Sequence, residues 1–321
     1  MRDQPKQILF ALLLLFVAAP AYANLTITAT FASSITSDPN ATAIEGVINN
    51  AIGFYESTFA DPITVAIDFG EMTSGLGSSS TYFANVSYSQ YLAALKADAK
   101  GATDAIAISL LANVANNPVN GNNTIDVKTA NLRAVGINAN PPVGQPDGTV
   151  DLNTHITDVG SPGTAGTYSL FATVEHEIDE ILGLGSALPN PAFSTIFPED
   201  LFRYDASGNR SFTTNAAAQA FFSINGTTHL AQFDNQNDGG DFGDWQSNPL
   251  PGGVGAKVQD AFATPGVHPV LTSSSPEVLA LDAIGYDLVN PAPEPTTVVL
   301  LGSILGLIVA KSRRRNGQTT A

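Results

Sequence analysis

Residues 167–184 constrain the fold more than any other segment, because they have the periodicity of an amphipathic helix. One face is apolar and is formed by Leu170, Val174, Ile178, Ile181 and Leu182. His176, Glu177 and Glu180 lie on a different face, with His176 and Glu180 one turn apart. The apolar face needs a sheet to cover it. The sequence therefore predicts a helix that packs on a sheet and presents a histidine and carboxylates on its other side.

Acidic residues crowd this helix. Glu175, Glu177, Asp179 and Glu180 are close neighbours, and the last two lie near the C-terminal end, where the helix dipole disfavours negative charge. A divalent cation would turn this repulsion into attraction. The chain has no cysteine, so His, Asp or Glu would have to bind such a metal. A solvated acidic face is the alternative interpretation.

The rest of the chain alternates between strand and helix patterns before this helix and is loop-rich after it. Strands are predicted over residues 25–31, 63–69, 80–88, 131–137 and 148–154, and helices over 40–59, 89–99 and 275–288. This order predicts an α+β fold. Residues 24–185 would form a twisted mixed sheet with the site helix, and residues 186–290 a C-terminal subdomain rich in loops.

Both ends of the chain have the composition of targeting segments. Residues 1–23 combine a basic start, an apolar run and the small-residue site Ala21-Tyr22-Ala23, which is typical of a secretory signal peptide cleaved by signal peptidase. At the other end, an apolar segment, residues 298–310, covers roughly 20 Å as a helix, less than a ~30 Å hydrocarbon core. It is flanked by Pro293, Glu294 and Pro295 before it and by Lys311, Arg313, Arg314 and Arg315 after it.

Residues 291–315 resemble the PEP-CTERM sorting signal of Gram-negative bacteria, which joins a Pro-Glu-Pro motif, a short membrane segment and an arginine cluster. The resemblance implies export across the inner membrane, contact with the membrane through the C-terminal segment, and recognition by an exosortase. We expect the protein in the cell envelope or outside the cell. An ordinary tail anchor is the alternative.

Without these two ends the chain is strongly acidic. Residues 24–290 keep 7 of the 13 Lys and Arg and 27 of the 29 Asp and Glu, a net charge of about −20. Such a surface repels the phosphates of nucleic acids, so we expect no nucleic-acid partner.

The site helix also carries a motif. Residues 176–186, "HEIDEILGLGS", resemble the metzincin signature His-Glu-x-x-His-x-x-Gly-x-x-His of matrixin-like and serralysin-like proteases. Glu180 replaces the second histidine, and Ser186 the third. Downstream blocks at residues 198–212, 221–245 and 279–288 resemble a family of secreted bacterial metalloproteases, several of which carry PEP-CTERM tails.

This resemblance implies a zincin-like metallopeptidase that hydrolyses peptide or protein substrates. His176 and Glu180 would bind zinc, and Glu177 would be the general base. Met1 and Met72 are the only methionines, so the methionine turn of metzincins is absent and we expect the broader zincin fold. A scaffold that has lost hydrolysis, acting as an envelope or extracellular-matrix protein, is the alternative function.

The third zinc ligand is less clear from the sequence. Asp200 follows Glu180 at a spacing seen for a third acidic ligand in some zincins, and it is the favoured candidate. The alternatives are Glu199, Asp205, His229 and His268. His155 is expected to be structural.

A calcium site is predicted within residues 234–245, "DNQNDGGDFGDW". Asp234, Asp238 and Asp241, with Asp244, supply oxygen ligands around a glycine pair. The twelfth position is Trp245 rather than the glutamate of an EF-hand loop. A polar, turn-rich loop is the alternative, and Trp245 could equally line a substrate cleft.

Overall fold

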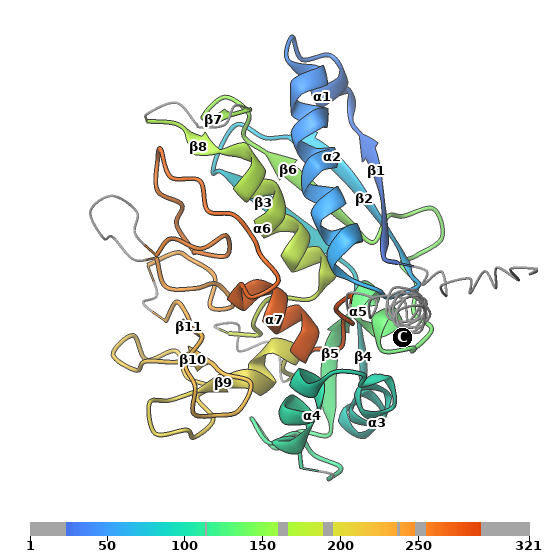
Figure 1. Cartoon of the computed structure of the whole chain (residues 1–321), viewed down its shortest axis with the longest axis vertical. Coiled ribbons are helices and arrows are strands. Elements are labelled where there is room, and N and C mark those ends of the chain that lie inside the picture. The colour runs from blue at the N-terminus through green and yellow to red at the C-terminus, as the bar shows by residue number, and fades with distance from the viewer. Residues whose placement is uncertain are drawn as a thin grey trace, which may run out of the picture.

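The structure is a computed structural model, and it describes residues 24–112, 114–159, 166–188, 195–235, 238–247 and 255–289. The predicted signal peptide and sorting segment lie outside these residues. The described residues form an α+β fold, as predicted (Figure 1). Within these ranges we find no helix that is both long and apolar enough to span a membrane.

The main sheet is mixed, with four strands in the order β1, β2, β6, β3. Strands β1 (Thr26–Phe31), β2 (Thr64–Glu71) and β6 (Gly148–Leu152) are parallel, and β3 (Gly77–Thr81) runs antiparallel to β6 at the edge. Alternate residues of β2, among them Val65, Ile67 and Phe69, are fully buried, as expected for a strand that a helix covers.

Two long helices, α2 (Ala41–Thr58) and α6 (Leu170–Leu182), lie side by side on this sheet (Figure 1). The short helix α1 (Ser33–Thr36) precedes α2. The apolar residues predicted to cover the sheet from α6 are all buried. The side chain of Ser169 caps the start of α6, accepting a hydrogen bond from the Ala172 amide at 3.2 Å, and the helix ends at Gly183. The helix that carries the motif is therefore fixed at both ends.

A second unit pairs β4 (Phe83–Ser87) with β5 (Thr124–Lys128), next to α3 (Tyr88–Asp98) and α4 (Ala102–Ser109). The strand predicted over residues 80–88 is therefore divided between β3 and β4. The strand predicted over residues 131–137 is wrong, because this segment forms α5 (Thr129–Ala134). Leu, Arg and Ala are good helix formers, and Gly136, with φ 78°, allows the turn that follows.

The remainder is mostly loops, as predicted, with short elements. These are β7 (Thr157–Asp158), β8 (Tyr168–Ser169), the 3₁₀ helix η1 (Pro198–Phe202), β9 (Arg203–Tyr204), β10 (Phe221–Phe222), β11 (Ala231–Gln232) and α7 (Pro276–Ala283). Helix α7 is shorter than the predicted helix over residues 275–288. Trp245 is fully buried against Phe222 and Phe233, so it belongs to the core rather than to a cleft wall.

The first and last described segments meet at the end of α2. The Leu25 amide donates to the carbonyl of Phe59 at 3.2 Å, and the Val289 amide donates to the carbonyl of Thr58 at 2.8 Å. Phe59 and Leu288 also form an antiparallel bridge. The chain therefore enters and leaves the described fold at the same place.

Candidate metal centre

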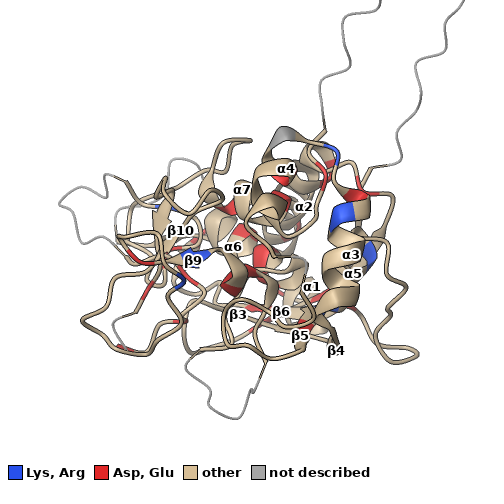
Figure 2. Ribbon diagram, turned by 90° about the horizontal axis from the view of Figure 1, so that it is seen from below, with Lys and Arg blue, Asp and Glu red and all other residues tan. Residues whose placement is uncertain are grey.

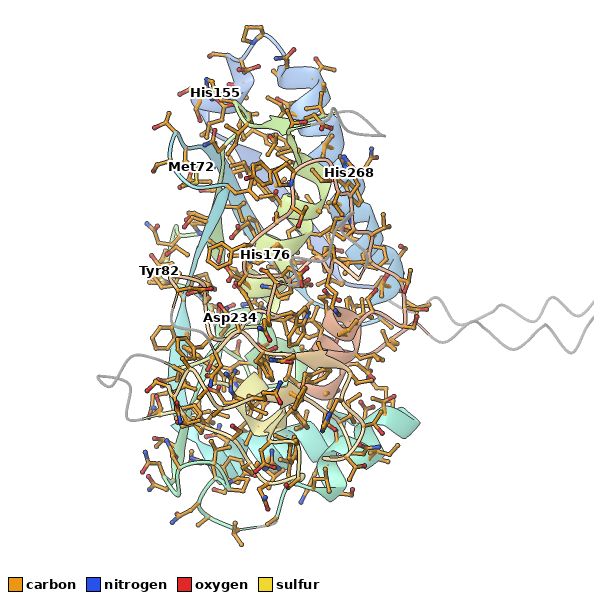
Figure 3. All side chains as sticks on the ribbon, turned by 90° about the vertical axis from the view of Figure 1, so that its left-hand side faces the viewer. Met72, Tyr82, His155, His176, Asp234 and His268 are labelled. Atoms are coloured by element: carbon orange, nitrogen blue, oxygen red, sulfur yellow. The ribbon has the colours of Figure 1, made fainter. Side chains whose placement is uncertain are left out.

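Two side chains of α6 and one from a distant loop converge at one place. His176, Glu180 and Asp244 each offer one ligand atom, and these three atoms lie within 4.8 Å of one another. His176 Nε2 is 3.9 Å from Glu180 Oε1 and 3.8 Å from Asp244 Oδ2. Figure 3 shows His176 in the middle of the molecule, on α6. The grouping of an imidazole with two carboxylates has the donor types that zinc accepts.

The histidine is oriented by a backbone carbonyl. His176 Nδ1 lies 3.0 Å from the carbonyl oxygen of Val258. A carbonyl oxygen can only accept, so Nδ1 must carry the proton, and in the neutral ring Nε2 then presents its lone pair to the carboxylates. Metal-binding histidines are commonly oriented by a partner of this kind. This hydrogen bond is therefore an observation that favours a metal at the site.

Glu180 is held by the neighbouring strand. The hydroxyl of Ser79, on the edge strand β3, donates to Glu180 Oε2 at 2.5 Å. This leaves Oε1 as the oxygen that faces His176. The buried Lys128 donates to the carbonyls of Glu180 and Leu184, both at 2.5 Å, and so neutralises the C-terminal end of α6. Both contacts reduce the freedom of Glu180.

Asp244 reaches the site because of a close approach between two loops. A Cβ on Gly243 would lie 2.5 Å from Gly185 Cα and 2.7 Å from the Ser186 nitrogen, so only glycine fits there. The Asp244 carbonyl accepts from the Asp234 amide at 2.7 Å, which ties this loop to the chain beyond β11. Gly243 thus allows Asp244 to approach the end of α6.

The charges of the site favour a cation. Burial alone would lower the pKa of His176, but the carboxylates of Asp244, Glu177 and Glu180 outweigh it and raise the pKa to about 10. Burial, opposed by His176, raises the pKa of Asp244 to about 7. Asp and Glu, in red in Figure 2, occur along α6, whereas Lys and Arg, in blue, are sparse in this view. The surroundings therefore stabilise positive charge between these side chains.

Glu177 lies next to the cluster at the wall of a cavity. It is buried, and burial raises its pKa to about 8, with His176 acting in the opposite direction. Its Oε1 packs against the Cα of Gly77 on β3, where a Cβ would collide with it. A cavity of about 610 Å³ borders His176, Glu177, Tyr168, Val258 and Phe262. A ligand in this cavity would meet His176 of the cluster and Glu177.

A glutamine lies among the three side chains. Gln259 Nε2 donates to Asp244 Oδ1 at 2.9 Å and lies 3.3 Å from His176 Nε2. Its side chain is almost fully buried. The sequence gives no sign of this residue, because it lies in a loop without a motif.

The structure places Asp244, rather than Asp200, with His176 and Glu180. Both carboxylate oxygens of Asp200 accept hydrogen bonds from neighbouring residues. The donors are Ser186 Oγ at 2.5 Å and the backbone amides of Ala187 and Phe197 at 3.1 and 2.9 Å. Asp200 therefore has a structural role close to η1. The sequence pattern instead favours a place for Asp244 in the predicted calcium loop.

The other candidates for the third ligand also lie apart from the cluster. Glu199 accepts from the Gly185 amide at 2.6 Å, and Asp205 accepts from Ser207 and Asn209 in a turn. His229 is exposed and stacks on Phe221 at 4.0 Å. Figure 3 shows His155 and His268 well away from His176. None of these five residues belongs to the cluster.

The three residues of the predicted calcium site do not form a compact group. Asp234 is buried, whereas Asp238 and Asp241 are exposed. The structure describes this loop except for residues 236–237, and in the described part these three carboxylates are not a group with ligand atoms within 4.8 Å of one another. Calcium binding by this loop stays a prediction.

A second compact group of acids lies at the C-terminal ends of α2 and α3. Asp61, Asp98 and Asp287 each have a carboxylate oxygen within 4.8 Å of the others. Lys100 forms an ion pair with Asp287 and lies 3.7 Å from Asp98 Oδ1. A lysine ammonium therefore already supplies a positive charge to this group.

The acidic crowding on α6 is divided between its two sides. Glu177 and Glu180 face the cluster, but Glu175 and Asp179 are buried on the side toward α2. The Tyr55 hydroxyl donates to Asp179 Oδ1 at 2.9 Å. Burial raises the pKa of Glu175 to about 8 and that of Asp179 well above its usual range, and the nearby Glu277 adds to both effects. Burial therefore favours the protonated form of both acids, which reduces their repulsion.

Comparisons with family models, with curated proteins and with solved structures gave no match to this chain. The site must therefore be interpreted from its own geometry.

Proposed function

We propose that this protein is an exported zinc-dependent metallopeptidase with a zincin-like fold, in which Glu177 is the general base. The observation that carries the proposal is the convergence of His176, Glu180 and Asp244 beside Glu177 at a cavity. The motif on α6 alone would support it less, because two of the three histidines of the metzincin signature are replaced.

The three side chains fit zinc by their donor types and their orientation. His176 would bind through Nε2, since Nδ1 is engaged by Val258, and Glu180 and Asp244 would each bind through a carboxylate oxygen. A bound zinc ion would supply Lewis-acid chemistry, polarising a peptide carbonyl and lowering the pKa of water. Two carboxylates offset more of the ion's charge than two imidazoles would, so this effect is weaker than at an all-histidine site.

The remaining roles belong to the chain itself. Glu177 would accept a proton from water in the cavity and return it to the leaving amine, which requires that a nearby cation lower the pKa that burial raises. Strand β3 is at the edge of the main sheet among the described residues, and an extended peptide could add to it as a further strand. Gly77 on that strand leaves the space that the Glu177 carboxylate occupies. These features support a peptide or protein substrate.

Export and sorting are part of the same proposal. The signal-peptide pattern of residues 1–23 and the PEP-CTERM-like residues 291–315 support transport across the inner membrane and handling by an exosortase. The absence of cysteine is compatible with an oxidising compartment, where no free thiol is at risk.

A non-catalytic scaffold is the second candidate function, and one observation favours it. The amide of Gln259 lies between His176 and Asp244, where an open coordination position would be needed for hydrolysis. A metal site closed by protein groups would stabilise the fold without activating water.

The test is zinc content by mass spectrometry, with casein hydrolysis followed in parallel. We expect about one zinc per chain in the purified wild type and in Glu177→Gln, and loss of zinc in Glu180→Ala and Asp244→Ala. Hydrolysis should disappear in all three variants, whereas Asp238→Asn, an exposed carboxylate of the neighbouring loop, should behave as wild type. Folded wild type that binds zinc without hydrolysing casein would favour the scaffold, and folded wild type without zinc would refute the metal site.

A further inference from the structure

We infer that Gln259 is a fourth protein ligand of the metal, binding through its side-chain amide oxygen. The inference rests on the metal site of the proposed function and adds a residue to it. If it holds, hydrolysis requires zinc to take its water as a fifth ligand, as catalytic zinc can; otherwise the site is the closed one of the scaffold.

The backbone of Gln259 is fixed on both sides. Its amide donates to Glu277 Oε1 at 3.1 Å, and its carbonyl accepts from the Trp245 amide at 2.8 Å. The preceding residue, Val258, holds His176 through its carbonyl. The same short segment therefore orients the histidine and aims the glutamine side chain into the cluster, and that side chain is only 1% exposed.

The spacing of the side chains matches a coordination shell. Ligand atoms about 2.1 Å from a tetrahedral ion are about 3.4 Å from one another. Gln259 Nε2 lies 3.3 Å from His176 Nε2 and 2.9 Å from Asp244 Oδ1, and His176 Nε2 lies 3.8 Å from Asp244 Oδ2. The amide end of Gln259 is therefore at the distance from His176 and from the Asp244 carboxylate that a neighbouring ligand would have.

The other end of the amide indicates why an oxygen belongs at this corner. Gln259 Oε1 is buried and has no hydrogen-bond partner among the described residues. An unpaired buried acceptor is costly, on the order of 1–3 kcal/mol. The two ends of an amide have nearly the same shape, so a half-turn of the amide brings the oxygen to the position of the nitrogen. With a cation between the side chains, the half-turn exchanges the hydrogen bond from Nε2 to Asp244 for a bond from Oε1 to the cation, and the nitrogen takes the oxygen's former position.

The proposal is tested on the full chain with Zn²⁺ and Co²⁺ as the probes. Zinc affinity is measured by competition with a chromogenic chelator, and the visible absorption of the cobalt protein reports the number and type of ligands. Gln259→Ala and Gln259→Leu should weaken zinc binding at least ~10-fold and change the cobalt spectrum. Gln259→Glu, which keeps an oxygen at the same place, should retain tight binding. Gln232→Ala, which removes a glutamine that pairs with Gln246 outside the cluster, should change neither reading.

The outcomes separate this inference from the proposed function. An unchanged cobalt spectrum in folded Gln259→Ala overturns the inference, even if zinc affinity falls, because a group that only positions His176 or Asp244 would weaken binding without leaving the coordination shell. Wild type that binds neither Zn²⁺ nor Co²⁺ refutes the metal site and this inference together. Wild type that binds both, with a spectrum that Gln259→Ala alters and Gln259→Glu restores, supports it.

Discussion

The hydroxyl of Ser79 orients one side chain of the candidate metal centre, because its hydrogen bond determines which oxygen of Glu180 faces His176. Ser79 lies on β3, and its hydrogen bond to Glu180 Oε2 crosses from the sheet to the helix. Partners of this kind orient ligands before the metal arrives, and their loss commonly costs 10–100-fold in metal affinity.

We therefore expect Ser79→Ala to weaken zinc binding about 10-fold without unfolding the protein, because Glu180 would lose its orientation but not its charge. Chelator competition gives the affinity, and circular dichroism checks the fold. Ser78→Ala is the matched control, since Ser78 is the adjacent residue of the same strand and is exposed. Equal zinc affinities for the two variants would show that the hydrogen bond does not position Glu180.

Single residues also show how far the sequence could predict this site. His176, Glu177 and Glu180 lie within one helical turn and a half, so helix periodicity alone puts them near one another. Asp244 and Gln259 lie on loops, and they arrive through the close approach at Gly243 and a backbone contact to Glu277. Such contacts depend on the tertiary structure and leave no local pattern in the sequence. Spacing along the chain therefore favours Asp200 over Asp244 as the third ligand.

At the scale of elements, α2 carries two glycines that its structure does not need. Gly46 and Gly53 lie in the helix interior, and a Cβ at either would meet nothing within 4 Å. Gly136, after α5, also has open space, but its φ of 78° lies in the left-handed region. The same substitution should therefore have opposite effects in the two places.

Gly53→Ala should raise the free energy of unfolding by about 1 kcal/mol, because alanine has the higher helix propensity. Gly136→Ala should lower it by about 1–2 kcal/mol, the usual cost of a Cβ in the left-handed conformation. Urea denaturation followed by circular dichroism measures both. A destabilised Gly53→Ala would mean that the exposed face of α2 is covered in solution.

Helices and strands could be predicted from the sequence where the hydrophobic pattern extends over many residues. Strands β1, β2 and β6 and helices α2, α3 and α6 fall where alternation or helical spacing placed them. The segment of α5 was mistaken for a strand because Leu132, Val135 and Ile137 are apolar in a short window, which helix and strand share. Strand β5 was missed although its residues alternate between polar and apolar, and the structure buries its polar Asp126 and Lys128 as well as its apolar residues.

At the scale of the whole molecule, buried acids make the stability depend on pH. Asp61 is 1% exposed, and burial raises its pKa from 3.8 to about 8, with Asp287 and Asp98 adding to the shift. Between about pH 4 and pH 8 the folded protein therefore holds a proton that the unfolded chain has lost. The free energy of unfolding must fall as the pH rises through this window.

Asp61→Asn should flatten this decline, because an asparagine does not ionise and keeps an oxygen for the Asp287 amide. Each unit of such a pKa shift is worth about 1.4 kcal/mol. Urea denaturation at pH 5 and pH 8, in buffer with a chelator, gives the two slopes. Asp151→Asn, an exposed carboxylate on β6, should follow the wild type. If all three proteins lose the same stability between the two pH values, Asp61 is ionised in the folded state.

The meeting of the first and last described segments at the end of α2 has a mechanical consequence. Thr58 and Phe59 hold Leu25 on one side and Leu288 and Val289 on the other. If force were applied to the C-terminal end of the chain, these few backbone hydrogen bonds would be the first to break, one after another. Helix α6, which bears His176 and Glu180, does not take part in these hydrogen bonds. The bonds could therefore break under tension while the candidate metal centre keeps its shape.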